Sequence, residues 1–263
     1  MAKACQLFSG SSGNSIFIAD KGTKILVDTG VTAKRIEEGL GAIGESAEEL
    51  SAIFITHEHF DHVKGLRVLA SRHKIPVFAD GRVIDRLRCD RYNDYSKIEL
   101  IEISENFELS GIEAVPFELS HDSAACIGYR FNLSGGKSVS VCTDTGYIPV
   151  AAKKALKGSQ LVFLESNHEV MMLENGPYPY LLKQRILSRK GHLSNADCAE
   201  FAVQLLQNGT TRINLSHISL ENNTPDIARV TTQSALTLAG FKEDYDYKLT
   251  LSPTENKGKP IIL

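Results

Sequence analysis

Short apolar segments recur along the chain, and each is bounded by Gly, Asn, Asp or Ser. Many of their residues are β-branched or aromatic, which favours extended strands. We therefore predict strands at residues 3–8, 15–19, 24–27, 52–56, 76–79, 98–103, 112–117, 127–132, 137–143, 161–165, 212–216 and 247–251.

Other segments show the hydrophobic spacing of amphipathic helices. These are residues 32–40, 63–71, 81–87, 149–156, 178–188, 195–207 and 226–238. The helix at 195–207 has the clearest start, because Ser194 can cap it and Asp197 follows three residues later. Strands precede helices in both halves of the chain, with extra hairpins first. Two packed sheets with helices outside them would bury these patterns, so we expect an α/β (α+β) fold.

Composition narrows the class of protein. The chain has 263 residues, of which 42% are hydrophobic and 23% charged, as in soluble globular proteins. A formal charge of -3 argues against a protein coated in basic residues, although a local basic groove remains compatible with it. We find no signal peptide and no apolar stretch long enough to span a bilayer, so we expect a cytoplasmic protein without membrane partners. The five cysteines form no C-x-x-C pair, which predicts reduced, mostly buried thiols.

The most informative segment is I-F-I-T-H-E-H-F-D-H at residues 53–62, where a predicted strand ends in a cluster of metal-ligand types. His57, His59, Asp61 and His62 lie within six positions, and imidazole and carboxylate groups bind zinc and similar ions. His57 and His59 point to one side of an extended chain, and a turn after them could direct Asp61 and His62 to a second ion. The alternative is a polar loop with a chance cluster, but three of the eight histidines occur here. We favour the metal site.

Further ligands should come from later strand ends. His121, Asp144 and His217 each follow an apolar strand, where sites on α/β scaffolds gather. Taken singly, a strand-end His or Asp more often caps a turn. Asp28 ends the strand at 24–27, and is either a turn former or a group that orients a ligand histidine; we favour the orienting role.

Polar residues outside this set could contact substrate. His192 precedes the capped helix at 195–207, whose free N–H groups favour a phosphate, and Arg189 and Lys190 add positive charge. His192 is a candidate proton donor, although a plain turn histidine is an equal alternative from spacing alone. We expect His168 to be a second-layer or substrate contact, with Glu165 as its orienting partner.

Two further segments are less specific. The loop at residues 9–15 lacks the Lys of a P-loop, so we expect a hairpin turn at the rim of the site with Asn14 available for hydrogen bonding. Arg82, Arg86, Arg88 and Arg91 form a basic stretch. It is either a solvated helix face or a patch that tracks a nucleic-acid backbone.

These residues together resemble the metallo-β-lactamase fold superfamily, whose H-x-H-x-D-H loop stands here at residues 57–62. The resemblance implies a single domain over residues 1–263 with an αββα four-layer sandwich. It also implies two divalent metal ions. One would be held by His57, His59 and His121, and the other by Asp61, His62 and His217. Asp144 would bridge the two, and Asp28 matches the family's earlier Asp.

Other segments are similar to the YycJ family of bacterial DNA exonucleases, also called WalJ or VicX. They are S-G-S-S-G-N-S at 9–15, E-S-N-H-E at 165–169, Y-P at 178–179 with K-Q-R-I-L-S at 183–188, and G-H-L-S-N at 191–195. This similarity favours a functional His192. It implies a cytoplasmic phosphodiesterase that cleaves nucleic acid, most simply DNA in the 5′–3′ direction, with a hydroxide shared by two zinc or manganese ions, iron being a further candidate. His192 and Asp61 would be the catalytic side chains.

Two alternatives remain open at this point. The same hydroxide could attack the carbonyl of a lactone, thioester or lactam, because one fold hosts many chemistries. A regulatory protein could instead keep metals for folding alone, although structural zinc sites normally have a closed ligand sphere. Oligomeric state and metal identity do not follow from the sequence.

Overall fold

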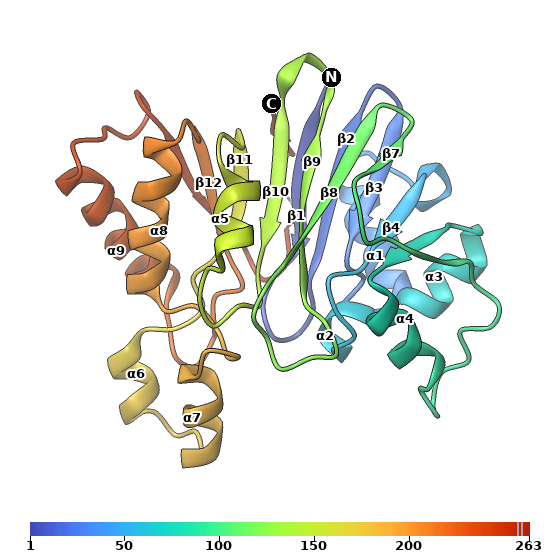
Figure 1. Ribbon diagram of the computed structural model, residues 1–263, viewed down its shortest axis with the longest axis horizontal. Coiled ribbons are helices and arrows are strands. Elements are labelled where there is room, and N and C mark those ends of the chain that lie inside the picture. Colours follow the sequence, from blue (N-terminus) through green and yellow to red (C-terminus); the bar gives the residue numbers. More distant parts are fainter. Residues whose placement is uncertain (257, 259) are drawn as a thin grey trace.

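Two seven-stranded sheets form the centre of the molecule, whose computed structural model describes residues 1–256, 258 and 260–263 (Figure 1). The first sheet has the order β14 (Ile261–Ile262), β1 (Lys3–Phe8), β2 (Ser15–Asp20), β3 (Thr23–Val27), β4 (Ala52–Phe54), β5 (Val77–Ala79) and β6 (Leu100–Glu102). The second has the order β13 (Lys248–Leu251), β12 (Arg212–Ser216), β11 (Leu161–Glu165), β10 (Ser138–Cys142), β9 (Ile127–Asn132), β8 (Ile112–Glu118) and β7 (Phe107–Leu109).

Both sheets change from antiparallel to parallel pairing along the chain. In the first, β1, β2 and β3 pair antiparallel and β3 to β6 pair parallel. In the second, β7 to β10 pair antiparallel and β10 to β13 pair parallel. Parallel neighbours need long crossover connections, and these are where the helices lie.

Helices cover the outer face of each sheet (Figure 1). On the first sheet these are α1 (Ala33–Ala42), α3 (Leu66–His73) and α4 (Gly81–Arg88), and on the second they are α5 (Val150–Leu156), α8 (Asn195–Gln207) and α9 (Pro225–Leu238). The predicted αββα sandwich is confirmed. Three short helices, α2 (Phe60–Val63), α6 (Val170–Asn175) and α7 (Tyr180–Leu187), lie at one end of the sheets (Figure 1), and two 3-10 turns are η1 (Ala47–Glu49) and η2 (Ser134–Gly136).

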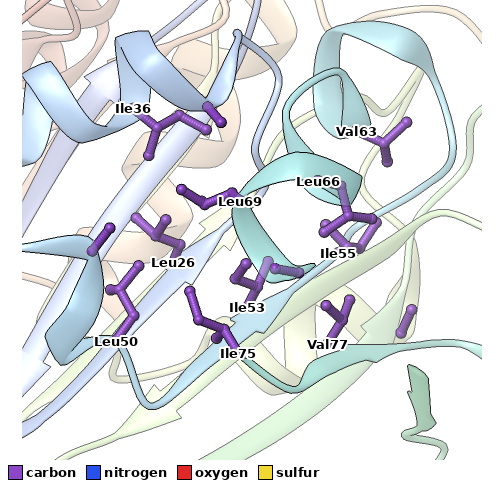
Figure 2. Close-up of a cluster of buried hydrophobic side chains, with 14 of the residues drawn as sticks. Leu26, Ile36, Leu50, Ile53, Ile55, Val63, Leu66, Leu69, Ile75 and Val77 are labelled. Carbon is purple, nitrogen blue, oxygen red and sulfur yellow. The ribbon is translucent and has the colours of Figure 1, made fainter. Parts of the chain in front are cut away.

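Three buried hydrophobic clusters separate the four layers. The first joins the first sheet to its helices, and Figure 2 shows Leu26 and Ile53 of the sheet facing Leu69 of α3. The second joins the other sheet to α5, α8 and α9. Between the sheets, Phe54 packs edge-on against Tyr129 at a ring separation of 5.5 Å. Successive residues of a strand point to opposite faces of the sheet, so central strands such as β3 and β4 supply a cluster on each face and are apolar along most of their length.

The elements differ from the sequence prediction in a few places. The helix predicted at 63–71 is two helices, α2 and α3, separated at Gly65. A Cβ at Gly65 would lie 2.3 Å from the carbonyl oxygen of Val31, so the backbone passes too close there for any other residue. The short elements α6, β7 and β14 were not predicted. In the described part of the chain, no helix combines the length and apolar character that crossing a bilayer demands.

Candidate metal centre

Strand ends from both sheets meet at the end of the sandwich where α2 lies. Asp28 follows β3, Asp144 follows β10 and His217 follows β12, and each has a left-handed backbone with φ of 62°, 64° and 55°. This conformation costs energy in residues other than glycine and often marks functional positions. The turn at each strand end directs a polar side chain across the edge of the sheets.

The motif loop supplies four more side chains after β4. His57 is fully buried. His59 has an extended backbone and immediately precedes α2, and Asp61 and His62 lie within that helix. The loop is held by the hairpin at residues 9–15, because the Asn14 backbone N–H donates to the Asp61 carbonyl at 2.8 Å. Gly30 permits this approach, since a Cβ there would lie 1.7 Å from the same oxygen.

All seven residues that the sequence predicts as metal ligands converge here. Side-chain donor atoms within 4.8 Å of one another form overlapping groups. One contains His57, His59 and His121, and another contains Asp61, His62 and His217. Asp144 lies between them, since it groups with His57 and His62 on one side and with His217 on the other.

The separations inside the centre are too long for hydrogen bonds. Nε2 of His62 is 3.4 Å from Oδ2 of Asp144 and 3.6 Å from Oδ2 of Asp61, and Nε2 of His217 is 3.6 Å from Oδ1 of Asp144. Two ligands about 2.1 Å from one tetrahedral ion would be about 3.4 Å apart. Nε2 of His57, Nε2 of His217 and Oδ2 of Asp144 are buried and have no hydrogen-bond partner among the residues that the structure describes. Buried polar atoms normally have partners, so this donor set fits metal ions.

The outer nitrogens of the imidazoles are held by fixed partners, as is usual for metal-binding histidines. Nδ1 of His62 lies 2.8 Å from Asp28, which also accepts from the Thr56 backbone and hydroxyl. Nδ1 of His121 donates to the Gly191 carbonyl at 3.0 Å. Glu165 accepts from Nδ1 of both His192 and His217 at 2.8 Å. Each partner aims Nε2 inward.

Burial and neighbouring charges set the protonation of the centre. Burial raises the pKa of Asp28. Burial disfavours a charged His62, but the carboxylates of Asp144, Asp28 and Asp61 outweigh it and raise its pKa to about 9. Burial and nearby imidazoles hold the pKa of His57 well below its usual value, which keeps it in the neutral form that binds metal. A cation bound among the three carboxylates would replace the charge carried by protonated His62.

The other residues singled out in the sequence occupy different places. Asn14 lies beside the centre, with Nδ2 3.1 Å from Nε2 of His62. Arg189 stacks over Tyr147 at 4.1 Å, and Lys190 is exposed; neither lines the pocket at the centre. His168 is buried and bridges to Ser194 through its backbone.

The expectation that Glu165 orients His168 was wrong. Its carboxylate accepts from His192 and His217 instead, and Nδ1 of His168 has no hydrogen-bond partner among the described residues. Burial of Glu165 would raise its pKa, but His192 and His217 lower it below its usual range. The ionised carboxylate ties the candidate proton donor to a candidate metal ligand.

Several pocket residues were not singled out as site residues in the sequence, although five of them lie in the segments quoted for the YycJ resemblance. A pocket of about 250 Å³ above the centre is also lined by Ser11, Asn167, Tyr178, Leu182, Arg185, Ile186 and Ser219. Asn167 donates to the carbonyl of His217 at 2.9 Å. Arg185 forms an ion pair with Asp122, next to His121. The places of Leu182, Arg185 and Ile186 in this pocket depend on how α7 packs against the sheets, a tertiary contact that local sequence patterns do not encode.

Comparison with known proteins agrees with this geometry. Residues 23–218 match the family described as a beta-lactamase superfamily domain. The chain is 37% identical to "Exodeoxyribonuclease WalJ" of Streptococcus pneumoniae over 246 residues, which cover 92% of this chain and 91% of that protein. It is 35% identical to "Exodeoxyribonuclease YycJ" of Bacillus anthracis over 236 residues, 89% of each chain.

Solved structures show the same fold at low sequence identity. The metallo-beta-lactamase fold protein YhfI from Bacillus subtilis superposes with a TM-score of 0.72 at 14% identity, covering 97% of this chain and 98% of that chain. The two resemblances seen in the sequence are thus confirmed. The chain belongs to the metallo-beta-lactamase superfamily and, within it, to the family of the WalJ and YycJ exodeoxyribonucleases.

Proposed function

We propose that this chain is a hydrolase with two divalent metal ions that cleaves phosphodiester bonds of DNA as an exonuclease. The observation that carries the proposal is the convergence of unpartnered imidazole and carboxylate atoms at one end of the sandwich. Similarity to two proteins named exodeoxyribonucleases, along most of both chains, supports DNA as the substrate. For the direction of cleavage we retain the 5′–3′ expectation.

We assign His57, His59 and His121 to one ion and Asp61, His62 and His217 to the other. Asp144 is assigned to both, because its donor atoms fall in groups with each set. Asp28 positions His62 through the 2.8 Å contact to Nδ1. Zinc, manganese and iron all suit these ligands. Bound ions would supply a water of lowered pKa and stabilise charge on the phosphate.

His192 is the candidate general acid. It lines the pocket with a side chain that is 14% exposed, and Glu165 accepts from its Nδ1. The carboxylate on Nδ1 fixes the orientation of the ring, so that the other ring nitrogen can give a proton to the leaving oxygen. Asp61 has a side chain that is 26% exposed and faces the pocket, where it can orient the attacking water.

The substrate phosphate has several candidate contacts around this pocket. Asn14 offers an amide near Asp61, at 3.5 Å from Oδ2. Arg189 and Lys190 add positive charge just before His192 and the start of α8. We assign His168 a supporting role at the start of α8. Its carbonyl accepts from the backbone N–H of Asn195, the first residue of that helix, at 2.9 Å.

The test compares purified wild type with Asp144→Asn and, as a control, Asp226→Asn, which changes an exposed carboxylate in α9. Metal content is measured, and turnover is followed on 5′-phosphorylated single- and double-stranded DNA, on RNA, and on a lactone and a thioester. We expect about two ions per chain, and DNA cleavage that a chelator removes and metal restores. Asp144→Asn should lose at least about 100-fold in kcat and part of the metal.

Other outcomes would reject the proposal. Turnover of the lactone or thioester without DNA cleavage would replace the phosphodiesterase by a carbonyl hydrolase. Full metal content without any turnover would favour a regulatory metal protein. An Asp144→Asn variant with wild-type metal content and kcat would remove Asp144 from the centre.

A further inference from the structure

A segment beside the metal pocket is strongly basic. Residues 175–196 contain Lys183, Arg185, Arg189 and Lys190 but no Asp or Glu. This segment includes α7, which projects beyond the edge of the sheets together with α6 (Figure 1). The whole chain has a formal charge of -3, so this concentration of positive charge is local rather than general.

The basic segment is continuous with the centre. Tyr178, Leu182 and Arg185 line the metal pocket, and the last two fall on one face of α7. Outside the pocket, Tyr180 is 72% exposed at the start of α7, and Arg189 and Lys190 are exposed after its end. Positive charge and exposed aromatic rings together are the features that bind single-stranded nucleic acid.

The arginines on and after α4 also lie near the metal centre, but their charge is balanced. A pocket of about 580 Å³ beside α4 shares His59 with the metal pocket and is lined by Arg86 and Arg91. Glu58 and Asp90 line the same pocket and balance its two arginines, and Asp122, which also lines it, is paired with Arg185. Arg82 pairs with Asp80 at 2.9 Å and with Glu118 at 3.1 Å. A polyanion meets less attraction here than at α7.

We infer that the DNA strand leaves the metal pocket along α7, with Lys183, Arg189 and Lys190 binding its phosphates and Tyr180 stacking on a base. This inference rests on the proposed function and names the surface that holds its substrate. Arg185 stands where the pocket meets this surface. Its ion pair with Asp122 joins α7 to the loop after β8 and fixes the guanidinium at the exit.

Binding to a hydrolysis-resistant strand tests the surface without requiring turnover. The metal-loaded protein is titrated with a fluorescent single-stranded oligonucleotide carrying phosphorothioate linkages, at about 50 to 200 mM salt. One variant combines Lys183→Ala, Arg189→Ala and Lys190→Ala. Its charge-matched control combines Arg86→Ala, Arg88→Ala and Arg91→Ala, three exposed arginines on and after α4.

The two variants should behave differently. Each phosphate contact to a single strand contributes about 0.7 to the slope of log K against log salt, so the α7 variant should lose about 2 from that slope. The α4 variant should keep the wild-type slope. Equal losses in both variants, or a loss confined to the α4 variant, would overturn the inference.

Stacking has its own pair of variants. Tyr180→Ala should weaken binding about 5- to 100-fold. Tyr245→Ala removes a ring that is 87% exposed on the loop before β13, and should leave affinity unchanged. Equal affinities for wild type and Tyr180→Ala would reject the stacking contact.

Turnover of bis(p-nitrophenyl) phosphate separates this inference from the proposed function. That small diester can enter the metal pocket without reaching Tyr180, which lies outside the pocket at the start of α7, so Tyr180→Ala should hydrolyse it as wild type does while its KM for DNA rises. If the wild type binds the oligonucleotide through α7 but hydrolyses neither the small diester nor DNA, the proposed nuclease activity is rejected and the DNA-binding surface stands. If the wild type cleaves DNA but the α7 substitutions leave its DNA affinity unchanged, the inference about the α7 surface is rejected and the proposed nuclease activity stands.

Discussion

At the scale of single residues, Glu165 links the two parts of the candidate centre. It is fully buried, and its Oε1 accepts from His192 and from His217, which lie 27 and 52 positions away in the chain. The same carboxylate accepts the Thr145 backbone N–H at 2.8 Å, next to Asp144. One side chain therefore orients a candidate acid, a candidate ligand and the turn that carries Asp144, the proposed bridging ligand.

We expect Glu165→Gln to lower metal affinity about 10- to 100-fold and to lower kcat, because losing a partner of this kind loosens the ligand it orients. Metal titration and DNA hydrolysis measure the two effects. Glu200→Gln, at an exposed position of α8, should change neither. Unchanged metal affinity in Glu165→Gln would show that His217 does not depend on this partner.

The predicted ligands could be found from the sequence because four of them are adjacent in one motif and the others end predicted strands. Their assignment to particular ions stays a prediction. The partners of Glu165, the role of Asn167 and the position of Arg185 could not be found this way. These contacts join segments that are distant in the chain, and nothing in the local pattern around Glu165 distinguishes His168 from His192 as its partner.

At the scale of elements, helix starts were predicted well where a side chain caps them. α8 begins at Asn195, and Ser194 Oγ accepts from the Asp197 backbone at 3.1 Å, as its sequence indicates. The predicted helix at 63–71 divides because the Gly65 backbone approaches Val31, a tertiary contact that propensity does not encode. α6, β7 and β14 span six, three and two residues, too short for a periodic pattern.

We expect Ser194→Ala to cost about 1 kcal/mol and to lower Tm by about 2 to 4 °C, because the first turn of α8 loses its capping oxygen. Thermal unfolding measures the change. Ser71→Ala, at an exposed position inside α3, should leave Tm within about 1 °C, since Ala favours helices. A Tm of Ser194→Ala equal to wild type would show that the cap contributes nothing.

At the scale of the whole molecule, a few polar contacts join the layers that hydrophobic packing assembles. Tyr129 of β9 is fully buried between the sheets, and its hydroxyl donates to the Ile55 carbonyl at 2.8 Å. Ile55 continues β4 toward His57, so this bond ties the second sheet to the motif loop of the first. The two-sheet sandwich was predictable from strand order, but this particular bond between the sheets was not.

We expect Tyr129→Phe to lower the free energy of unfolding by about 1 to 2 kcal/mol, because a buried carbonyl loses its donor. Tyr247→Phe is the matched control, since Tyr247 is also buried and its hydroxyl has no partner among the described residues. Denaturant unfolding compares the two. Similar losses in both variants would assign the effect to packing rather than to the hydrogen bond.

An ion-pair group joins the starts of β1 and β3 and makes stability depend on pH. Glu45 has a side chain that is 4% exposed and pairs with Lys3 and, at 2.7 Å, with Lys24. Burial acts to raise the pKa of Glu45, but the two lysines outweigh it and hold the pKa below its usual value of 4.5. A lowered folded pKa means that the stabilisation is present above about pH 4.5 and disappears as pH falls through the folded pKa.

We expect Glu45→Gln to destabilise the protein by about 1 to 2 kcal/mol at neutral pH, and the difference from wild type to shrink below about pH 4.5. Denaturant unfolding across pH measures it. Glu38→Gln should stay within about 0.5 kcal/mol, because its pairing partner Lys34 is 83% exposed. A difference independent of pH would indicate that shape rather than charge matters at Glu45.

At Asp28, Asp144 and His217, which have left-handed backbones, the residue that would be most stable differs from the residue that the proposed activity requires. Glycine or asparagine would adopt each of these conformations at lower energy than the residues present. Laboratory selection for thermal stability alone would thus favour substitutions at three positions of the proposed metal centre, and we expect the resulting variants to be more stable but inactive. Substitutions intended to raise the thermal stability of this protein should therefore leave those three positions unchanged and be made in the helices on the outer faces of the sheets.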